Sequence, residues 1–158
     1  MTEKDEYFMT RAIGLAQNGM DSNAGGPFGA VVVKDGEIIG EGWNQVTSTN
    51  DPTAHAEVMA IRQACRRLGS FQLDNCVLYT SCEPCPMCLG AIYWARPEKV
   101  FFACTREDAA AIGFDDHFIY DEIEKPVAER QLEIVNFMRG EALTVFQSWQ
   151  DKLDKTRY

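Results

Sequence analysis

The chain lacks any apolar run long enough to cross a lipid bilayer, and its first residues, MTEKDEYF, carry charges where a secretory signal peptide has an apolar region. It also lacks internal repeats, low-complexity tracts and flexible linkers. A chain of 158 residues, 46% of them hydrophobic, is long enough to bury one sizeable core. We therefore expect a single cytoplasmic domain that spans residues 1–158.

Positive charge is also scarce. The chain has 15 Lys and Arg residues against 24 Asp and Glu residues, which gives a formal net charge of -9. An acidic surface repels the phosphates of nucleic acids and provides no long-range attraction toward them. The balance therefore counts against an RNA or DNA partner, although a local basic patch stays compatible with it. With no apolar run to cross a bilayer either, we expect a small-molecule substrate, no nucleic acid and no membrane.

One short pattern carries most of the chemistry that the sequence offers. His55 and Glu57 stand two positions apart, and Pro84, Cys85 and Cys88 follow later in the chain. An imidazole and two thiolates are three ligands of the kind that zinc takes, and a three-ligand site keeps a fourth position open for water, as catalytic sites do. The sequence therefore predicts Zn²⁺ held by His55, Cys85 and Cys88, with Glu57 beside the water.

The six cysteines suggest metal binding more than disulfide bonds, because the expected compartment is reducing. Cys65, Cys76 and Cys104 stand inside apolar patterns and are expected to be small core residues. Cys82 is expected to pack near the metal. The alternative is a closed structural site in which Cys82 is a fourth ligand, but such a site leaves Glu57 without a role.

Hydrophobic periodicity and turn residues predict an alternation of helices and strands. Helices are expected at about 3–17, 51–68, 86–94, 107–112 and 142–153. Strands are expected at 30–34, 37–43, 76–80, 99–103 and 132–138, the first two joined by an Asp-Gly turn. This order predicts an α/β fold, a three-layer α/β/α sandwich with helices on both faces of a mixed five-stranded sheet.

In this arrangement the metal ligands come from two helix N-termini, whose partial positive charge lowers the pKa of a thiol. Two thiolates nearly cancel the charge of Zn²⁺, so the bound water should be acidified less than at an all-histidine site. A general base is then needed, and Glu57 is placed to take a proton from the water and to return it to a leaving amine. The residues therefore predict hydrolytic deamination.

These residues resemble the cytidine deaminase superfamily, whose known signature is H-x-E followed by P-C-x-x-C. Residues 51–57 and 83–88 look like its purine branch, which includes tRNA adenosine deaminases and bacterial guanine deaminases. The stretches 25–30, 90–96 and 113–116 favour the guanine deaminases, and the last, Gly-Phe-Asp-Asp, discriminates best. The resemblance covers about residues 8–158 and implies a cytidine-deaminase-like fold.

The resemblance also implies roles for side chains outside the metal site. Phe28 would stack on the purine, Asn44 would hydrogen-bond its edge, and Trp94 would wall the pocket. Asp116 would face the amino group and ring nitrogens, either as an anchor or as a second proton relay. Tyr158 would reach the active site of a partner subunit in a homodimer. Each residue also has a purely structural interpretation: core packing for the two large aromatics, a turn for Asn44, solvation for Asp116 and a frayed terminus for Tyr158.

The leading hypothesis is a zinc-dependent guanine deaminase that makes xanthine and ammonia in purine salvage or breakdown. A carboxylate suits guanine, whose edge offers a ring N–H beside an NH₂ group, better than adenine, which has no ring N–H there. A tRNA adenosine deaminase is the nearest alternative, and it would need a basic surface. Deamination of guanosine, cytosine or triazines, and a zinc-stapled binding module without catalysis, are further alternatives.

Overall fold

The computed structural model describes residues 1–158, which form two compact units, Met1–Asp116 and His117–Tyr158. The strands of the first unit are β1 (Gly29–Lys34), β2 (Glu37–Trp43), β3 (Cys76–Cys82) and β4 (Lys99–Cys104). Its helices are α1 (Glu3–Asp21), α2 (Val46–Thr49), α3 (Ala56–Leu68), α4 (Pro86–Ala95) and α5 (Arg106–Ala111). None of the helices is both long and apolar enough to span a bilayer.

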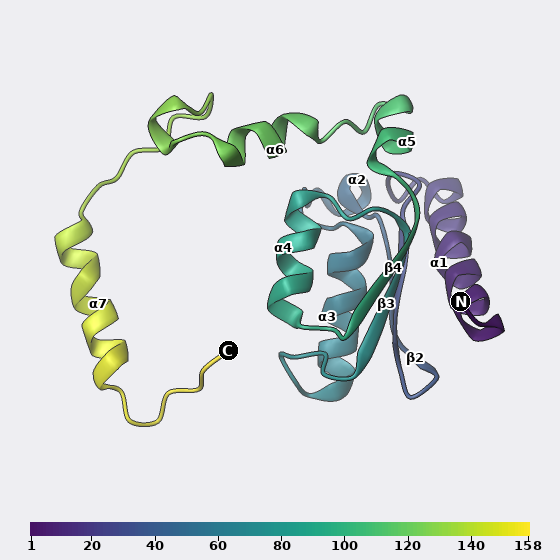
Figure 1. Cartoon of the computed structure of the whole chain (residues 1–158), viewed down its shortest axis with the longest axis horizontal. Coiled ribbons are helices and arrows are strands. Elements are labelled where there is room, and N and C mark those ends of the chain that lie inside the picture. Colours follow the sequence, from purple (N-terminus) through teal and green to yellow (C-terminus); the bar gives the residue numbers. More distant parts are fainter. The chain divides into compact units, whose positions relative to one another are not determined.

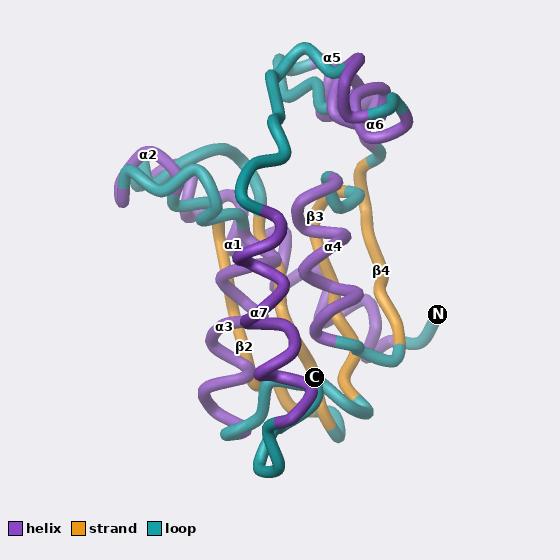
Figure 2. Tube along the Cα trace, turned by 90° about the vertical axis from the view of Figure 1, so that its left-hand side faces the viewer, coloured by secondary structure: helices purple, strands orange, loops and turns teal.

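The four strands form one mixed sheet in the order β2-β1-β3-β4. β1 pairs antiparallel with β2 and β3, and β3 pairs parallel with β4. Asp35 and Gly36 make the predicted turn of the β1–β2 hairpin, both with positive φ. Helix α4 connects β3 to β4, as a crossover between parallel strands requires. Figure 2 shows β2 and β4 at the two edges of the sheet.

Helices cover both faces of this sheet, so the predicted three-layer α/β/α arrangement is confirmed. Figure 1 shows α1 on one face and α3 with α4 on the other. The strand residues alternate accordingly: Val31 and Val33 pack with Phe8 of α1, whereas Ala30 and Val32 pack in the cluster that includes α3 and α4. Two buried cores, one on each face, therefore hold the layers together.

Helix α3 packs unusually close to β2 because two strand positions have no side chain. A Cβ atom on Gly40 would overlap the carbonyl oxygen of Ala60, and one on Gly42 would overlap that of Ala56. On the helix, Ala56, Ala60 and Ala64 are fully buried against the strand. This contact sets the position of the N-terminus of α3, from which two predicted site residues project.

The second unit contains α6 (His117–Glu124), a 3₁₀ turn η1 (Val127–Glu129) and α7 (Arg139–Asp151). No residue of these three elements is buried. Glu122 holds the turn region together, because its carboxylate pairs with Lys125 at 2.6 Å and accepts the backbone N–H of Gln131 at 2.7 Å. The apolar side chains of this unit, such as Phe137 at 83% exposure, therefore have little cover.

The predicted fifth strand at 132–138 is wrong, because this segment is irregular and the sheet has four strands. The segment has strand-like composition, but a strand also needs a neighbouring backbone to pair with, and it pairs with none in this chain. Helix α6 was not expected in the same region.

The predicted helix start at residues 51–53 is also wrong, because α3 begins at Ala56. Asp51 instead makes a local turn: its Oδ1 accepts the backbone N–H of Thr53 at 2.8 Å and the Thr53 hydroxyl at 2.7 Å. Aspartate before proline favours such a turn as readily as a helix cap. The helix begins only after His55, which is its N-cap.

Candidate active site

The three predicted metal ligands come together at the N-termini of two helices. His55 is the N-cap of α3, Cys85 is the N-cap of α4, and Cys88 lies in the first turn of α4. The Nδ1 atom of His55 lies 3.5 Å from the Sγ atoms of both Cys85 and Cys88, and all three ligand atoms lie within 4.8 Å of one another. A tetrahedral Zn²⁺ ion separates nitrogen and sulfur ligands by about 3.6 Å. The donor set and its spacing therefore fit zinc.

The two thiols affect each other's pKa in opposite directions. The hydrogen bond with Cys88 and the neighbouring His55 lower the pKa of Cys85 to about 4. The hydrogen bond with Cys85, followed by burial, raises the pKa of Cys88, and the Cys85 sulfur raises the pKa of His55. Both sulfurs bind a metal as thiolates, so binding of a divalent cation would displace any proton that remains on the pair.

Glu57 projects from the first turn of α3 into the same site and is only 6% exposed. Its Oε1 accepts the hydroxyl of Thr80 at 3.2 Å, and its Oε2 lies 3.3 Å from the Sγ of Cys88. Burial raises the pKa of this carboxyl. This carboxyl therefore lies beside a metal ligand, where it could serve a water bound to the metal, and its raised basicity suits a proton acceptor.

The closed four-ligand alternative has no support, because Cys82 does not join the ligand cluster. Its thiol donates instead to the carbonyl oxygen of Thr105 at 3.6 Å, and burial raises its pKa to about 11. All six cysteines are free thiols, so no disulfide forms. The core prediction is confirmed for Cys76 and partly for the half-buried Cys65, but it is wrong for Cys104, which is exposed at the end of the edge strand β4.

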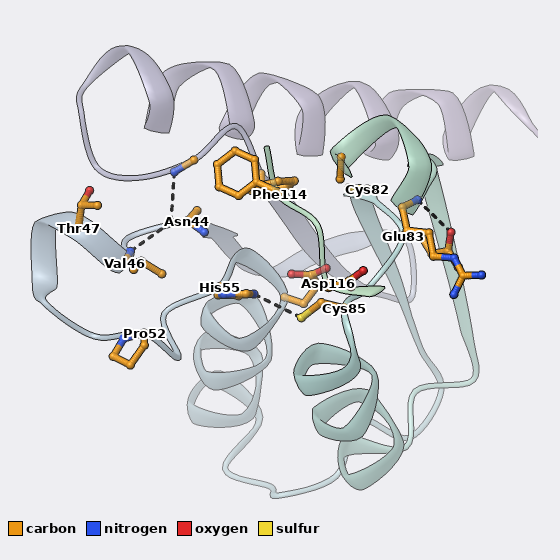
Figure 3. A pocket seen from close by; sticks show the side chains of 15 residues that line it. Asn44, Val46, Thr47, Pro52, His55, Cys82, Glu83, Cys85, Phe114 and Asp116 are labelled. Carbon is orange, nitrogen blue, oxygen red and sulfur yellow. Dashed lines mark hydrogen bonds between the residues drawn. The ribbon is translucent and has the colours of Figure 1, made fainter. Parts of the chain in front are cut away.

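A cavity of about 380 Å³ opens above the ligands, a volume that suits a small molecule. Figure 3 shows the side chains that surround it, with His55 and Cys85 facing each other from the ends of two helices. All of its lining residues belong to the first unit. The predicted Phe28, Asn44, Glu57 and Asp116 line it together with Gly26, Val46, Thr47, Pro52, Cys82, Glu83, Arg106, Ala109 and Phe114.

Two predicted binding residues do not line this cavity. Trp94 lies on α4 with 64% of its surface exposed, and Tyr158 lies in the second unit with 70% exposed. Their roles at the site stay predictions.

Asn44 is buried and oriented by its neighbours. Its side-chain oxygen accepts the backbone N–H groups of Gly26 at 3.3 Å and Val46 at 3.2 Å, as Figure 3 shows. Because the oxygen is occupied, the amide NH₂ group remains as a donor for whatever enters the cavity. A Cβ atom on Gly25 would collide with this side chain, so the glycine there gives Asn44 its room.

Phe114 was not assigned a role from the sequence, although it stands in the Gly-Phe-Asp-Asp stretch. Its ring lies edge-on to Phe28, with centroids 5.0 Å apart and planes at 89°. The two rings form one aromatic wall of the cavity. Asp116, two residues on, completes this side, and burial followed by the nearby Cys85 charge raises its pKa.

Thr80 was also missed. The sequence shows a threonine in a mostly apolar strand, but this pattern alone does not reveal that its hydroxyl bonds to Glu57.

Comparison with known proteins matches residues 2–104 to the family model described as the cytidine and deoxycytidylate deaminase zinc-binding region. A guanine deaminase from Bacillus subtilis is 60% identical over 97% of this chain and 98% of its own length. An X-ray structure of a guanine deaminase from that organism superposes with a TM-score of 0.95 at 58% identity, covering 100% of this chain and 99% of the other.

More distant relatives match a smaller part. A tRNA-specific adenosine deaminase from Aquifex aeolicus is 46% identical over 62% of this chain and 64% of its own. A crystal structure of a variant of NE0047 in complex with 8-azaguanine superposes with a TM-score of 0.68 at 35% identity, over 71% of this chain and 65% of the other.

Proposed function

This chain belongs to the cytidine and deoxycytidylate deaminase zinc-binding family, and from that premise we propose that it is a zinc-dependent guanine deaminase. It converts guanine and water to xanthine and ammonia. The observation that carries the proposal is a three-ligand zinc site with the buried Glu57 beside its Cys88 ligand, next to a cavity of about 380 Å³ that is large enough for a purine. The near full-length similarity to a guanine deaminase supports the choice of base.

The reaction needs a proton acceptor that later becomes a donor. Bound Zn²⁺ supplies Lewis acidity, which lowers the pKa of a water molecule. Glu57 accepts a proton at Oε2 as the water oxygen attacks the ring carbon that carries the amino group. The carboxyl passes this proton to the neighbouring ring nitrogen, whose double bond to that carbon breaks. It then takes the proton of the new hydroxyl and donates it to the amino group, which departs as ammonia while the carbon becomes a carbonyl. Burial of Glu57 supports both steps, because a raised pKa makes it a better base and keeps it protonated for the second transfer.

The cavity walls match the chemistry of guanine. Phe28, held edge-to-face by Phe114, offers a surface on which the purine stacks. The free NH₂ group of Asn44 donates to an acceptor on the purine edge. Asp116 accepts from the ring N–H and the amino group, as an anchor or as a second relay. Adenine has no ring N–H on that edge and would leave the half-buried Asp116 carboxylate unpaired, so the binding of adenine is disfavoured.

The second candidate is a tRNA adenosine deaminase, because the Aquifex protein of that name is 46% identical to this chain over 98 residues. That match leaves out more than a third of this chain, whereas the guanine deaminase match covers nearly all of it. The net charge of -9 also opposes the binding of a tRNA. We therefore favour the free base.

The deciding experiment measures ammonia release from guanine, adenine, cytosine, guanosine and a triazine, and inosine formation in tRNA, with the zinc-loaded protein. We expect rapid turnover of guanine and no inosine in tRNA. Inosine in tRNA together with intact guanine would refute the proposal in favour of the second candidate. Preferential turnover of another ring would keep the deaminase chemistry and reject the choice of base.

We also propose that the protein acts in the cytoplasm as a homodimer in which the C-terminal helix and tail are exchanged between subunits. The free thiols and thiolate ligands suit a reducing compartment. The poorly covered apolar side chains of the second unit suit contact with another copy.

Mixed dimers test the exchange directly. Co-expressed Glu57→Gln and Tyr158→Ala chains form one intact site per mixed dimer if the tail acts on the partner, so activity should appear that neither variant has alone. If the tail acts within its own chain, the mixed dimers contain no intact site and stay inactive. Sedimentation of the wild-type protein as a monomer would reject the dimer.

A further inference from the structure

The hydroxyl of Thr80 is buried in the strand behind the catalytic carboxyl. Thr80 lies in β3, between Ala30 of β1 and Phe102 of β4, and is 1% exposed. Its hydroxyl makes one hydrogen bond, to Oε1 of Glu57 at 3.2 Å. A carboxylate can only accept, so the hydroxyl donates and the direction of this bond is fixed.

This bond distinguishes the two carboxyl oxygens of Glu57. Oε1 faces Thr80, and Oε2 lies 3.3 Å from the sulfur of Cys88. When Cys88 is a thiolate ligand of zinc it has no proton to donate, so the only remaining side-chain donor to the carboxyl is Thr80. Oε2 is then the oxygen free to take a proton from water.

Thr80 is more rigid than the Glu57 side chain that it holds. The backbone of Thr80 is paired in the sheet on both sides, and a β-branched residue has restricted rotation about χ1. Glu57, in contrast, has three rotatable side-chain bonds on a helix. A proton acceptor must stay within hydrogen-bond distance of the proton that it takes, so a small displacement is costly.

We propose that Thr80 is a positioning residue, which holds Oε1 of Glu57 through its buried hydroxyl and thereby presents Oε2 as the proton-accepting atom. This inference rests on the proposed function, since it assigns the orientation of the group that performs proton transfer there. A residue that only filled space would need the shape of threonine but not its hydroxyl.

The test compares Thr80→Val, which keeps the shape and loses the hydroxyl, with Thr80→Ser, which keeps the hydroxyl. For Thr80→Val we expect kcat for guanine to fall by about 10- to 100-fold, KM to change less than about twofold, and one zinc to stay bound per chain. For Thr80→Ser we expect kcat within about threefold of wild type. A crystal structure of zinc-loaded Thr80→Val should show Oε1 displaced from its wild-type position.

Wild-type kcat in Thr80→Val would overturn the inference, as would a rise in KM that accounts for the whole loss. If Thr80→Val does not fold, the pair Thr80→Ser and Thr80→Ala, which differ only in the hydroxyl, replaces it, and equal kcat in these two would likewise reject the role. Guanine turnover by the wild-type protein separates the two claims: its absence rejects the proposed function, whereas its presence with an unaffected variant rejects only the role of Thr80.

Discussion

The clearest prediction concerns Glu57→Gln, because this substitution removes one chemical property and little else. Glutamine has almost the same shape, and its side-chain oxygen can still accept the Thr80 hydroxyl that now binds Oε1 at 3.2 Å. At the position of Oε2 the variant carries an NH₂ group, which cannot take a proton from water. The ligands His55, Cys85 and Cys88 are untouched, so zinc should stay bound.

The expected fall in kcat follows from the replacement of Oε2, the proton-accepting atom, by an NH₂ group. General acid–base catalysis by a positioned side chain contributes about 10²- to 10⁴-fold to a rate, or about 3 to 5 kcal/mol of the barrier. Because Glu57 serves as acceptor and then as donor, we expect kcat to fall toward the upper end of this range. The stability of the metal-free protein should stay equal or rise, since burial disfavours the charged form of Glu57.

The assay pairs ammonia release from guanine with zinc content and urea denaturation of the same preparation. Glu41→Gln is the matched control: Glu41 lies on β2 and pairs with Arg11 at the surface at 2.7 Å, so its loss should spare turnover. A Glu57→Gln protein with one bound zinc and a kcat within about tenfold of wild type would refute the proton-transfer role.

Removal of zinc by a chelator should abolish turnover and lower the melting temperature, and Cys85→Ser should do the same without a chelator; activity that persists in zinc-free protein would contradict the assignment. Gly42→Ala should destabilise the protein by about 1–3 kcal/mol in urea and also lower kcat, because the new Cβ overlaps the Ala56 carbonyl at the start of α3; an unchanged midpoint would show that the contact is not tight. Tyr79→Phe removes a hydroxyl that donates to Asp5 at 2.6 Å, the first cause of the lowered pKa of Asp5. Because the pKa of Asp5 is lower in the folded state, its charged form stabilises the fold at pH values above the unfolded-state pKa of about 4, and this stabilisation is lost as the pH falls through the folded-state pKa. The melting temperature of the wild type should therefore exceed that of the variant by the full amount at pH 7 and by less below about pH 4. An equal difference at pH 7 and below pH 4 would argue against this role of the hydroxyl.

The metal site was predictable because the kinds of residue and their short spacing define it. Two thiolates and one imidazole form a donor set that suits Zn²⁺, and the turn of helix between Cys85 and Cys88 brings both thiols to one side. Pro86 at the first helical position marked the start of α4 for a similarly local reason. The Asp-Gly hairpin followed from local turn chemistry, and the helices on both faces of the sheet followed from the spacing of apolar residues along the chain. Both signals depend only on residues that are close in sequence.

The rest depended on packing between distant segments. Local propensity placed a strand at 132–138, but a strand exists only where another backbone pairs with it, and the chain provides none there. No short-range pattern shows that Thr80 of β3 donates to Glu57 of α3, or that Phe114 lies against Phe28. The sequence alone thus determined which atoms bind the metal and what reaction they permit. Only the tertiary structure decided how the carboxyl is held and how the cavity is walled, because these contacts join elements far apart in the chain and depend on where the sheet and helices bring them together.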